Sequence, residues 1–411
     1  MSRDPAAPDL RSIVVLGLLS TFGPLSLDLY LPALPQLADE LGSTPSAAQL
    51  TITACLIGLA LGQLVAGPLS DRLGRRRPLI VGLVAYLLAS LACAFAPSVG
   101  VLVVLRLVQG LAGAAGLVIA RAVARDLYEG RRLVLFFSRL TLISGLAPVV
   151  APVLGGQLSR VMSWRGIFVV LAGFGAVLLL AGLAQRETLP PERRSAGGLS
   201  NTLQGFQVLL RDRFFLGAAL SAGLAGASMF AYISGSTFVL QRIYGLSAQG
   251  FSFAFGLNSV GIMVMSQVGG RLSQRWPANR VLALGLALNL LGAGALAATV
   301  LLGLGLVFLL ASLFVMVSAL GLVFPTATAL AMSGYPDRAG AASSLLGLGQ
   351  FVFGAVVAPL VGIAGEGTAV PLGVVALSVS ACASVAFVTL VLPSVRAASR
   401  QEVLPQARPP G

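Results

Sequence analysis

The sequence predicts an all-α polytopic membrane protein with twelve transmembrane helices in two pseudo-symmetric six-helix bundles. Hydrophobic residues make up 57% of the 411-residue chain and charged residues only 10%, whereas a soluble protein is about half apolar and a quarter charged. Apolar runs of about 20 residues, the length that crosses a bilayer as a helix, recur along the whole chain. A match between the two halves of the chain indicates that a six-helix unit occurs twice.

The limits of the twelve spans follow from proline, glycine and charged residues. In chain order the spans cover 11–33, 48–69, 78–96, 99–121, 135–158, 166–185, 214–240, 250–271, 280–301, 305–330, 339–364 and 369–392. They divide the chain into an N-terminal bundle, a cytoplasmic linker, a C-terminal bundle and a cytoplasmic tail, at 1–185, 186–213, 214–392 and 393–411. A short interfacial helix is expected in the linker stretch SNTLQGFQVLL.

The arginines predict the orientation of the chain. All 27 basic residues are arginines, and 22 of them fall on segments that share a side with both termini. Only Arg160, Arg165 and Arg242 fall on the other side, and Arg106 and Arg139 lie within spans. Because arginine accumulates in cytoplasmic loops, we expect both termini in the cytoplasm. The net charge of +13 is then an orientation signal, and no nucleic-acid partner is expected.

The internal match lies between the second and third spans of each half. GPLSDRLGRRRPL at 67–79 aligns with GRLSQRWPANRVL at 270–282, at an offset of 203 residues. In the second copy Gln274 replaces Asp71, and Trp276 and Pro277 interrupt the run of glycine and arginine. Transporters built from such repeats hold their substrate between the repeats, near the middle of the membrane.

Several motifs resemble one known family. GPLSDRLGRRRP resembles the loop signature between the second and third helices of the major facilitator superfamily. LRLVQG at 105–110 is similar to its fourth-helix arginine motif, and GLAPVVAPVLGG at 145–156 to the fifth-helix motif of its antiporters. DLYLPALP and AGAASSLLGLGQF resemble the bicyclomycin and chloramphenicol resistance branch of the twelve-span drug:proton antiporters. The resemblance covers nearly the whole chain and implies the major facilitator fold and proton-coupled transport.

Asp28, in the stretch TFGPLSLDLYLPALP, is the sole acid that lies clearly inside a predicted span. The low dielectric of a membrane interior makes an ionised carboxylate costly, and a group that must load and release protons needs such a setting. The chain has no histidine, so proton chemistry must use carboxylates. We predict that Asp28 carries the coupling proton. The alternative is a solvated carboxylate near the outer interface.

Arg106 is expected at a similar depth in the fourth span, about 10 Å from its outer end. An arginine does not lose its charge in proteins, so at that depth it needs polar neighbours. The matching depth favours electrostatic coupling to Asp28, and the resemblance implies a role in proton transfer. The alternative is a structural hydrogen bond to backbone carbonyl groups.

The loop after the second span and the inner end of the fourth hold a predicted inner-gate latch. Gly67 should let the second helix approach a neighbour closely, and Asp71 should pair with an arginine or with a helix N-terminus. Arg121 and Arg125 are the candidate partners. The resemblance implies that this cluster, with Arg72, holds the inner gate shut when the transporter opens outward. The remaining charges of the loop fit ordinary orientation signals: Arg75, Arg76 and Arg77.

The fifth span combines prolines, which permit bending, with glycines, which permit close packing. Both suit a helix that moves, with plain packing as the alternative. The residues are Gly145, Pro148, Pro152, Gly155 and Gly156.

A drug cavity should be mostly apolar and aromatic with a few polar anchors. The candidates within spans are Tyr30, Tyr232, Phe253, Asn258 and Gln350. Phe22, Phe255 and Asn289 fit equally well. No metal site is expected, because the three cysteines (Cys55, Cys93 and Cys382) share no ligand-like spacing and fit buried apolar positions.

These features predict proton-coupled efflux of small amphipathic drugs by alternating access, with chloramphenicol- and bicyclomycin-like antibiotics as candidate substrates. The proton gradient supplies the energy, and no cofactor is expected because the chain lacks a nucleotide-binding glycine motif. The expected setting is a monomer among lipids in the bacterial inner membrane. One alternative is an exporter of a sugar, nucleoside or other metabolite. The other is a sensor that transports nothing or a membrane-embedded enzyme, and the absent histidine argues against an enzyme.

Overall fold

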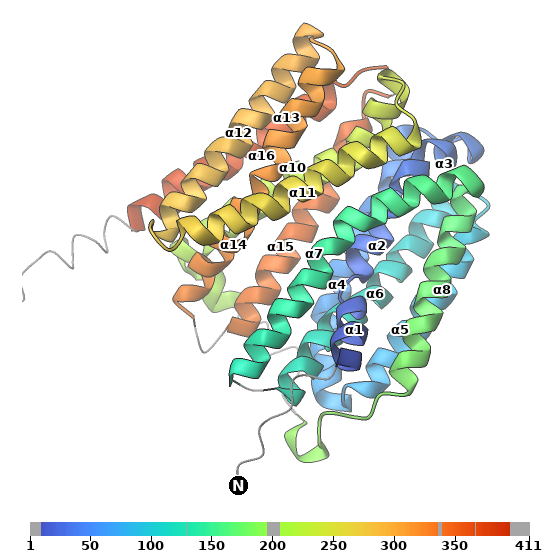
Figure 1. The fold of residues 1–411 in the computed structure, drawn as a ribbon, viewed down its shortest axis with the longest axis vertical. Coiled ribbons are helices and arrows are strands. Elements are labelled where there is room, and N and C mark those ends of the chain that lie inside the picture. Colours follow the sequence, from blue (N-terminus) through green and yellow to red (C-terminus); the bar gives the residue numbers. More distant parts are fainter. Residues whose placement is uncertain (1–9, 129, 195–205, 336–338, 366, 395–411) are drawn as a thin grey trace, which may run out of the picture.

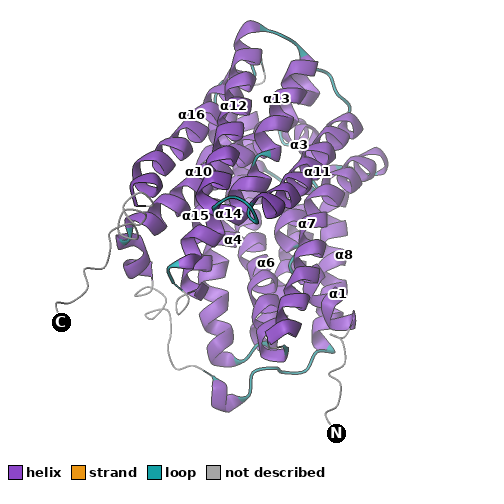
Figure 2. Cartoon of the chain, turned by 60° about the vertical axis from the view of Figure 1, so that its left-hand side comes forward, coloured by secondary structure: helices purple, strands orange, loops and turns teal. Residues whose placement is uncertain are grey.

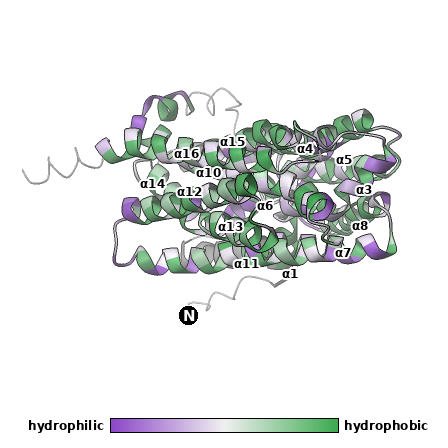
Figure 3. Ribbon diagram, turned by 90° about the horizontal axis from the view of Figure 1, so that it is seen from above, coloured by the Kyte–Doolittle hydropathy of each residue, from purple (hydrophilic) through white to green (hydrophobic). Residues whose placement is uncertain are grey.

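The computed structural model describes residues 10–128, 130–194, 206–335, 339–365 and 367–394. The described chain is helical, with no strand in these ranges (Figure 2). Most residues along the helices are hydrophobic, and strongly hydrophilic residues gather toward helix ends and connections (Figure 3). This distribution suits helices whose sides face lipid.

The first half of the chain contains nine helical elements before the linker (Figure 1). They are α1 (Leu10–Leu19), α2 (Phe22–Asp28), η1 (Leu31–Ala33), α3 (Leu34–Glu40), α4 (Pro45–Leu73), α5 (Arg76–Ala94), α6 (Val99–Leu127), α7 (Gly130–Val161) and α8 (Trp164–Leu183). The linker contains the 3-10 turn η2 (Pro191–Arg193). Residues 206–211 are also helical and overlap the end of the stretch 200–210 where a linker helix is expected, and 195–205 lie outside the described residues.

The second half repeats this plan. Its elements are α10 (Arg213–Phe238), the π-helix η3 (Val239–Ile243), α11 (Ala248–Leu272), α12 (Ala278–Leu302), α13 (Leu306–Ser318), α14 (Leu320–Ser333), α15 (Ala339–Val357), the 3-10 helix η5 (Ala358–Gly362), α16 (Val370–Ala386) and the π-helix η6 (Phe387–Val391).

Within the described residues, ten helices are long and apolar enough to cross a membrane. Two further passes are α7 and the segmented run from α1 to α3, which extend alongside the other helices of the first half (Figure 1). The chain therefore makes the twelve passes that the sequence predicts. Cys55 and Cys93 are buried as expected, but the expectation for Cys382 is wrong, since this side chain is exposed.

The first pass is longer and more broken than predicted. It ends at Glu40 instead of residue 33, because Pro32 and Pro35 occupy the first turns of η1 and α3. A missing backbone N–H costs little at the start of a helix, so these prolines interrupt the pass without ending it. Asp28 consequently lies near the middle of the pass and not near its end.

The two halves meet mainly through α4 against α15 and α7 against α11. We call the end at which α4 joins α5 the arginine-rich end and the other the opposite end. Toward the opposite end, one apolar core contains residues of both halves, such as Leu34 and Ile52 with Phe251 and Val361. At the arginine-rich end, each buried cluster stays within one half. The halves are therefore joined toward the opposite end and separate at the arginine-rich end.

Polar contacts between the halves show the same asymmetry. Within the described residues these contacts run from the opposite end to mid-depth, and most are accepted by backbone carbonyl oxygens. They are Ser46 to Pro359 O, Gln49 to Ser234 O, Gln241 to Pro32 O, Gln249 to Gly156 O, Ser259 to Pro148 O, Arg242 to Pro35 O and the ion pair of Arg242 with Asp39. Together they close the molecule at the opposite end.

Glycines allow α4 and α6 to pack backbone against backbone. A Cβ atom added to Gly58 would overlap the carbonyl oxygen of Leu107, and one added to Gly110 would overlap that of Cys55. By contrast, a Cβ on Gly294 of α12 would meet no atom within 4 Å. The two kinds of helical glycine should therefore respond oppositely to the same substitution.

We expect Gly58→Ala to lower the free energy of unfolding by about 1–3 kcal/mol, because backbone atoms cannot yield as side chains do. The matched control, Gly294→Ala, should raise it by about 0.5–1 kcal/mol, since alanine favours a helix. The midpoint of thermal unfolding in detergent measures both. Equal stability of the Gly58→Ala variant and the parent would contradict this packing.

Candidate functional site

Asp28 is the last residue of α2, at the break before η1, and its side chain is only 5% exposed. No hydrogen bond or ion pair of this carboxylate is found among the described residues. The burial argues against the alternative of a solvated group near a membrane surface. A carboxylate that is buried without a positive partner is costly to keep ionised.

One residue of the second half, Tyr232 of α10, lies within electrostatic range of Asp28. The Tyr232 hydroxyl accepts a hydrogen bond from Asn258 Nδ2 of α11 at 2.8 Å. The Tyr232 ring stacks on Phe255, with 5.1 Å between ring centres. All three side chains are buried. The structure thus brings Asp28, Tyr232 and Asn258 together from α2, α10 and α11.

The remaining predicted substrate residues do not join this group. Tyr30 is fully buried inside the first half, and its hydroxyl pairs with that of Thr51 at 3.0 Å. Phe253 is 64% exposed, so the prediction that it lines a central cavity finds no support. Gln350 of α15 is partly buried and lies against Gly226 of α10.

The rival candidates also differ in their surroundings. Phe255 stacks on Tyr232, whereas Phe22 is buried in the first half, with its ring centre 4.4 Å from that of Tyr86. Asn289 is buried in the second half, where it donates to Ser228 Oγ at 3.1 Å.

Arg106 is fully buried within the first half and not between the halves. Its guanidinium carbon lies 4.5 Å from the centre of the Tyr30 ring and 5.6 Å from that of Phe168. Nη1 donates to Gln109 Oε1 at 2.5 Å, and Nε donates to the Thr51 carbonyl oxygen at 3.4 Å. The backbone bond matches the structural alternative, and the two aromatic rings add cation–π contacts. Nη2 is buried and has no hydrogen-bond partner in the described structure.

No ion pair joins Arg106 to Asp28 in the described structure, so the expected electrostatic coupling is not a direct contact. Instead, Arg106 contacts Tyr30, on one flank of Asp28. The Tyr30 ring lies under its guanidinium. On the other flank, Ser26 and Tyr86 pair through their hydroxyl groups at 2.7 Å. These contacts fix the backbone on both sides of the buried carboxylate.

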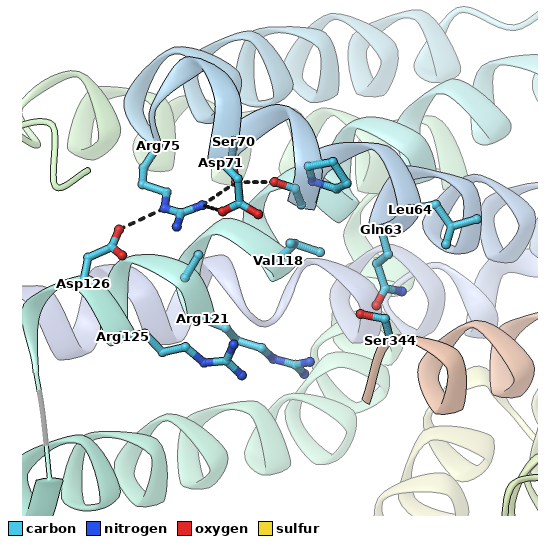
Figure 4. A pocket seen from close by; sticks show the side chains of 13 residues that line it. Gln63, Leu64, Ser70, Asp71, Arg75, Val118, Arg121, Arg125, Asp126 and Ser344 are labelled. Carbon is cyan, nitrogen blue, oxygen red and sulfur yellow. Dashed lines mark hydrogen bonds and ion pairs between the residues drawn. The ribbon is translucent and has the colours of Figure 1, made fainter. Parts of the chain in front are cut away.

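The predicted latch at the arginine-rich end has a different arrangement from the one expected. Asp71 pairs with Arg75 and not with Arg121 or Arg125, and Arg75 Nε also binds Asp126 Oδ2 at 2.9 Å (Figure 4). The interpretation of Arg75 as an ordinary orientation signal is therefore incomplete, because its side chain forms ion pairs with both Asp71 and Asp126. Spacing favours the observed partner, since Asp71 and Arg75 are four residues apart in sequence.

Two other residues of the predicted latch, Gly67 and Arg72, make no close contact that would support such a role in the described structure. A Cβ on Gly67 would lie 3.7 Å from Val118, an ordinary distance, so the expectation that this glycine permits a close helix approach is wrong. Arg72 is exposed, and no hydrogen bond or ion pair is recorded for it in the described chain.

Glu187, just after α8, is a residue that the sequence interpretation missed. Its carboxylate accepts backbone N–H bonds from Arg75 at 2.8 Å, Arg76 at 3.1 Å, and Thr188 and Leu189 at 3.0 Å each. Burial alone would raise the pKa of Glu187, but these four donors stabilise the carboxylate and lower its pKa below the usual value. Glu187 thereby ties the start of the linker to the start of α5.

In α7, one predicted proline has a clear structural consequence. Pro152 has no N–H, so the carbonyl oxygen of Pro148 loses its helical partner. Ser259 of α11 donates to this oxygen at 3.1 Å and thereby links the two halves. A Cβ on Gly155 or Gly156 would overlap Leu29 O or Ser252 Oγ, which shows that both glycines permit close approach. The side-chain surroundings of Gly145 lie outside the described residues.

A cavity of about 440 Å³ opens at the arginine-rich end (Figure 4). Helices α4 and α6 supply most of its walls, and α15 supplies one residue. The lining residues are Gln63, Leu64, Gly67, Pro68, Ser70, Asp71, Arg75, Val118, Arg121, Ala122, Arg125, Asp126 and Ser344. The volume is in the range of small-molecule sites, but the lining is more polar than the predicted drug cavity.

Comparison with known proteins identifies the family. The sequence profile of the Major Facilitator Superfamily matches residues 16–359. An uncharacterized MFS-type transporter of Bacillus subtilis, YdgK, is 40% identical over 91% of this chain and 93% of its own. A bicyclomycin resistance protein homolog of Haemophilus influenzae is 32% identical over 88% and 91% of the two chains. A chloramphenicol resistance protein of Pseudomonas aeruginosa is 34% identical over 70% and 68%.

Solved structures support the fold. The crystal structure of the nucleoside transporter NupG superposes with a TM-score of 0.73 at 13% identity. The match covers 93% of this chain and 97% of NupG. At this identity the similarity concerns the arrangement of helices alone.

We expect Glu187→Ala to lower the midpoint of thermal unfolding, because it leaves four backbone N–H groups without their acceptor. Since the pKa of Glu187 is lower in the folded protein, its contribution is complete above the pKa of a free glutamate, about 4.3. The difference between variant and parent should therefore shrink as the pH falls below that value. Glu192→Ala, at an exposed position of the same linker, is the control and should change little.

Proposed function

The chain belongs to the major facilitator superfamily and is a secondary transporter, not an enzyme, and we propose that it exports small amphipathic drugs in exchange for protons. Relatives named for bicyclomycin and chloramphenicol resistance support this substrate class. The observation that carries the proton part is Asp28, which is buried beside Leu27 and Leu29 of the core shared by the two halves, without a positive partner in the described structure.

The proposal includes the setting of the protein. Positive residues favour the cytoplasmic side, so the arginine-rich end faces the cytoplasm and the chain is a multi-pass monomer of the bacterial inner membrane. The structure is then open toward the cytoplasm and closed toward the outside. No cofactor takes part, and the proton gradient supplies the energy.

The contacts between the halves suggest how the proton moves. In the present state the shared core and the bonds between the halves separate Asp28 from the opposite end, so its proton leaves toward the cytoplasm. Once the halves exchange their open and closed ends, Asp28 takes a proton from outside. A proton on Asp28 weakens drug binding and a bound drug favours proton release, which is a reciprocal coupling of the two ligands.

Tyr232 and Asn258 are the residues through which the protonation of Asp28 would affect the second half. Both belong to the second half, and Tyr232 lies within reach of the Asp28 charge. A change in that charge therefore acts across the surface along which the halves must move. A drug bound between the halves would be exposed to the same change.

We expect Asp28→Asn to abolish uphill transport while leaving drug exchange intact, because the amide cannot carry a proton. In proteoliposomes with an imposed pH gradient, the parent should accumulate chloramphenicol or a bicyclomycin analogue. The variant should lose the coupling factor, about 5- to 150-fold for a typical linkage, and still exchange labelled for unlabelled drug without a gradient.

Glu192→Gln removes an exposed carboxylate and is the matched control. Uphill transport by Asp28→Asn at the rate of the parent would refute Asp28 as the proton carrier. Accumulation of sugars or nucleosides, with no movement of either antibiotic, would instead support a metabolite exporter of the same fold.

A further inference from the structure

Arg121 and Arg125 lie one turn apart near the end of α6, and both side chains are exposed in the cavity at the arginine-rich end. In Figure 4 the two guanidinium groups extend side by side, away from Asp71 and Asp126. They point toward the side of the cavity on which Ser344 of α15 lies. A ligand between them and Ser344 would contact both halves of the molecule.

Neither arginine has a hydrogen bond or ion pair with any other residue of the described structure. Among the described residues, the acids that line the same cavity, Asp71 and Asp126, are already bound, since Arg75 bridges them. Arg121 and Arg125 carry charges of the same sign one turn apart on α6. Like charges one turn apart oppose helix formation, so this arrangement lacks the anion that would stabilise it.

Orientation of the chain does not require this arrangement. An orientation signal needs positive charge near the membrane surface, and exposed arginines such as Arg76 and Arg77 already supply it. Arg121 and Arg125 instead share the wall of a concave site with the polar side chains of Gln63 and Ser344. Guanidinium groups bind carboxylates and phosphates through paired hydrogen bonds, which suits two neighbouring arginines to one oxyanion.

We propose that Arg121 and Arg125 form a binding site for an oxyanion, a carboxylate or a phosphate, at the cytoplasmic entrance of the transport path. The substrates then include amphipathic acids, and lipophilic cations are disfavoured at this entrance. This assignment of a substrate class rests on the proposed export function. The oxyanion has two possible sources: a soluble amphipathic acid, or the headgroup of an anionic phospholipid that enters between the halves.

The test compares three probes with the same apolar body: pyrenebutyrate, its methyl ester and a pyrenebutyl trimethylammonium ion. Their dissociation constants are measured by fluorescence on the purified full-length protein in phosphatidylcholine nanodiscs, without a pH gradient. The parent should bind the carboxylate about 10- to 100-fold more tightly than the ester, as expected for charge-assisted hydrogen bonds. It should bind the ammonium ion more weakly than the ester.

The double variant Arg121→Gln with Arg125→Gln should lose the preference for the carboxylate and keep its affinity for the ester. The matched control is Arg271→Gln with Arg275→Gln, which removes two exposed arginines at the same spacing and at the same end of the molecule, outside the cavity. The control should retain the full preference. Retained affinity for the ester also shows that the double variant is folded.

A second set of nanodiscs contains phosphatidylglycerol and identifies the source of the oxyanion. If this lipid weakens carboxylate binding to the parent but not to the double variant, the headgroup occupies the site. If it has no effect, the ligand is the soluble acid. Equal binding of carboxylate and ester by the parent would overturn the proposal, as would an undiminished preference in the double variant. Because binding needs no gradient, a failure of proton-driven export would leave this result unchanged.

Discussion

The central constraint on this molecule is the burial of one carboxylate, Asp28, beside the core that the two halves share, with no positive partner in the described structure. Such a group is expensive to hold ionised in a low-dielectric interior. The surrounding chain must therefore be rigid enough to keep it in place and mobile enough to expose it to water. Ser26 and Tyr30, two residues away on either side, are both held inside the first half.

Arg106 explains how the first half achieves that rigidity. Its guanidinium contacts aromatic rings, an amide and a carbonyl group of the first half alone, so these contacts can persist when the halves move, although Nη2 has no hydrogen-bond partner in the described structure. A direct bond between Arg106 and Asp28 would keep Asp28 ionised and hinder its protonation, because a neighbouring cation favours the ionised carboxylate. The contacts of Ser26 and Tyr30 hold Asp28 in position without favouring either its protonated or its ionised form.

The fold follows from the sequence more completely than the site does. Apolar length and the arginine pattern predict twelve passes, because both depend on the membrane and not on tertiary detail. They do not show that Pro32 and Pro35 extend the first pass to Glu40, since proline can either end a helix or begin one. Glu187 carries no signal of its role in the sequence, because it binds backbone groups more than one hundred residues away.

The two ends of the molecule are held by different means, and this difference bears on alternation between states. At the opposite end, bonds from Gln49, Gln241 and Gln249 join the halves and must break when that end opens. At the arginine-rich end, the bonds of Arg75 and Glu187 stay within the first half, so they can persist while the halves move. Closure there must then create new contacts that offset those lost. An anion bound by Arg121 and Arg125 beside α15 would supply such a contact and would favour closure around the ligand.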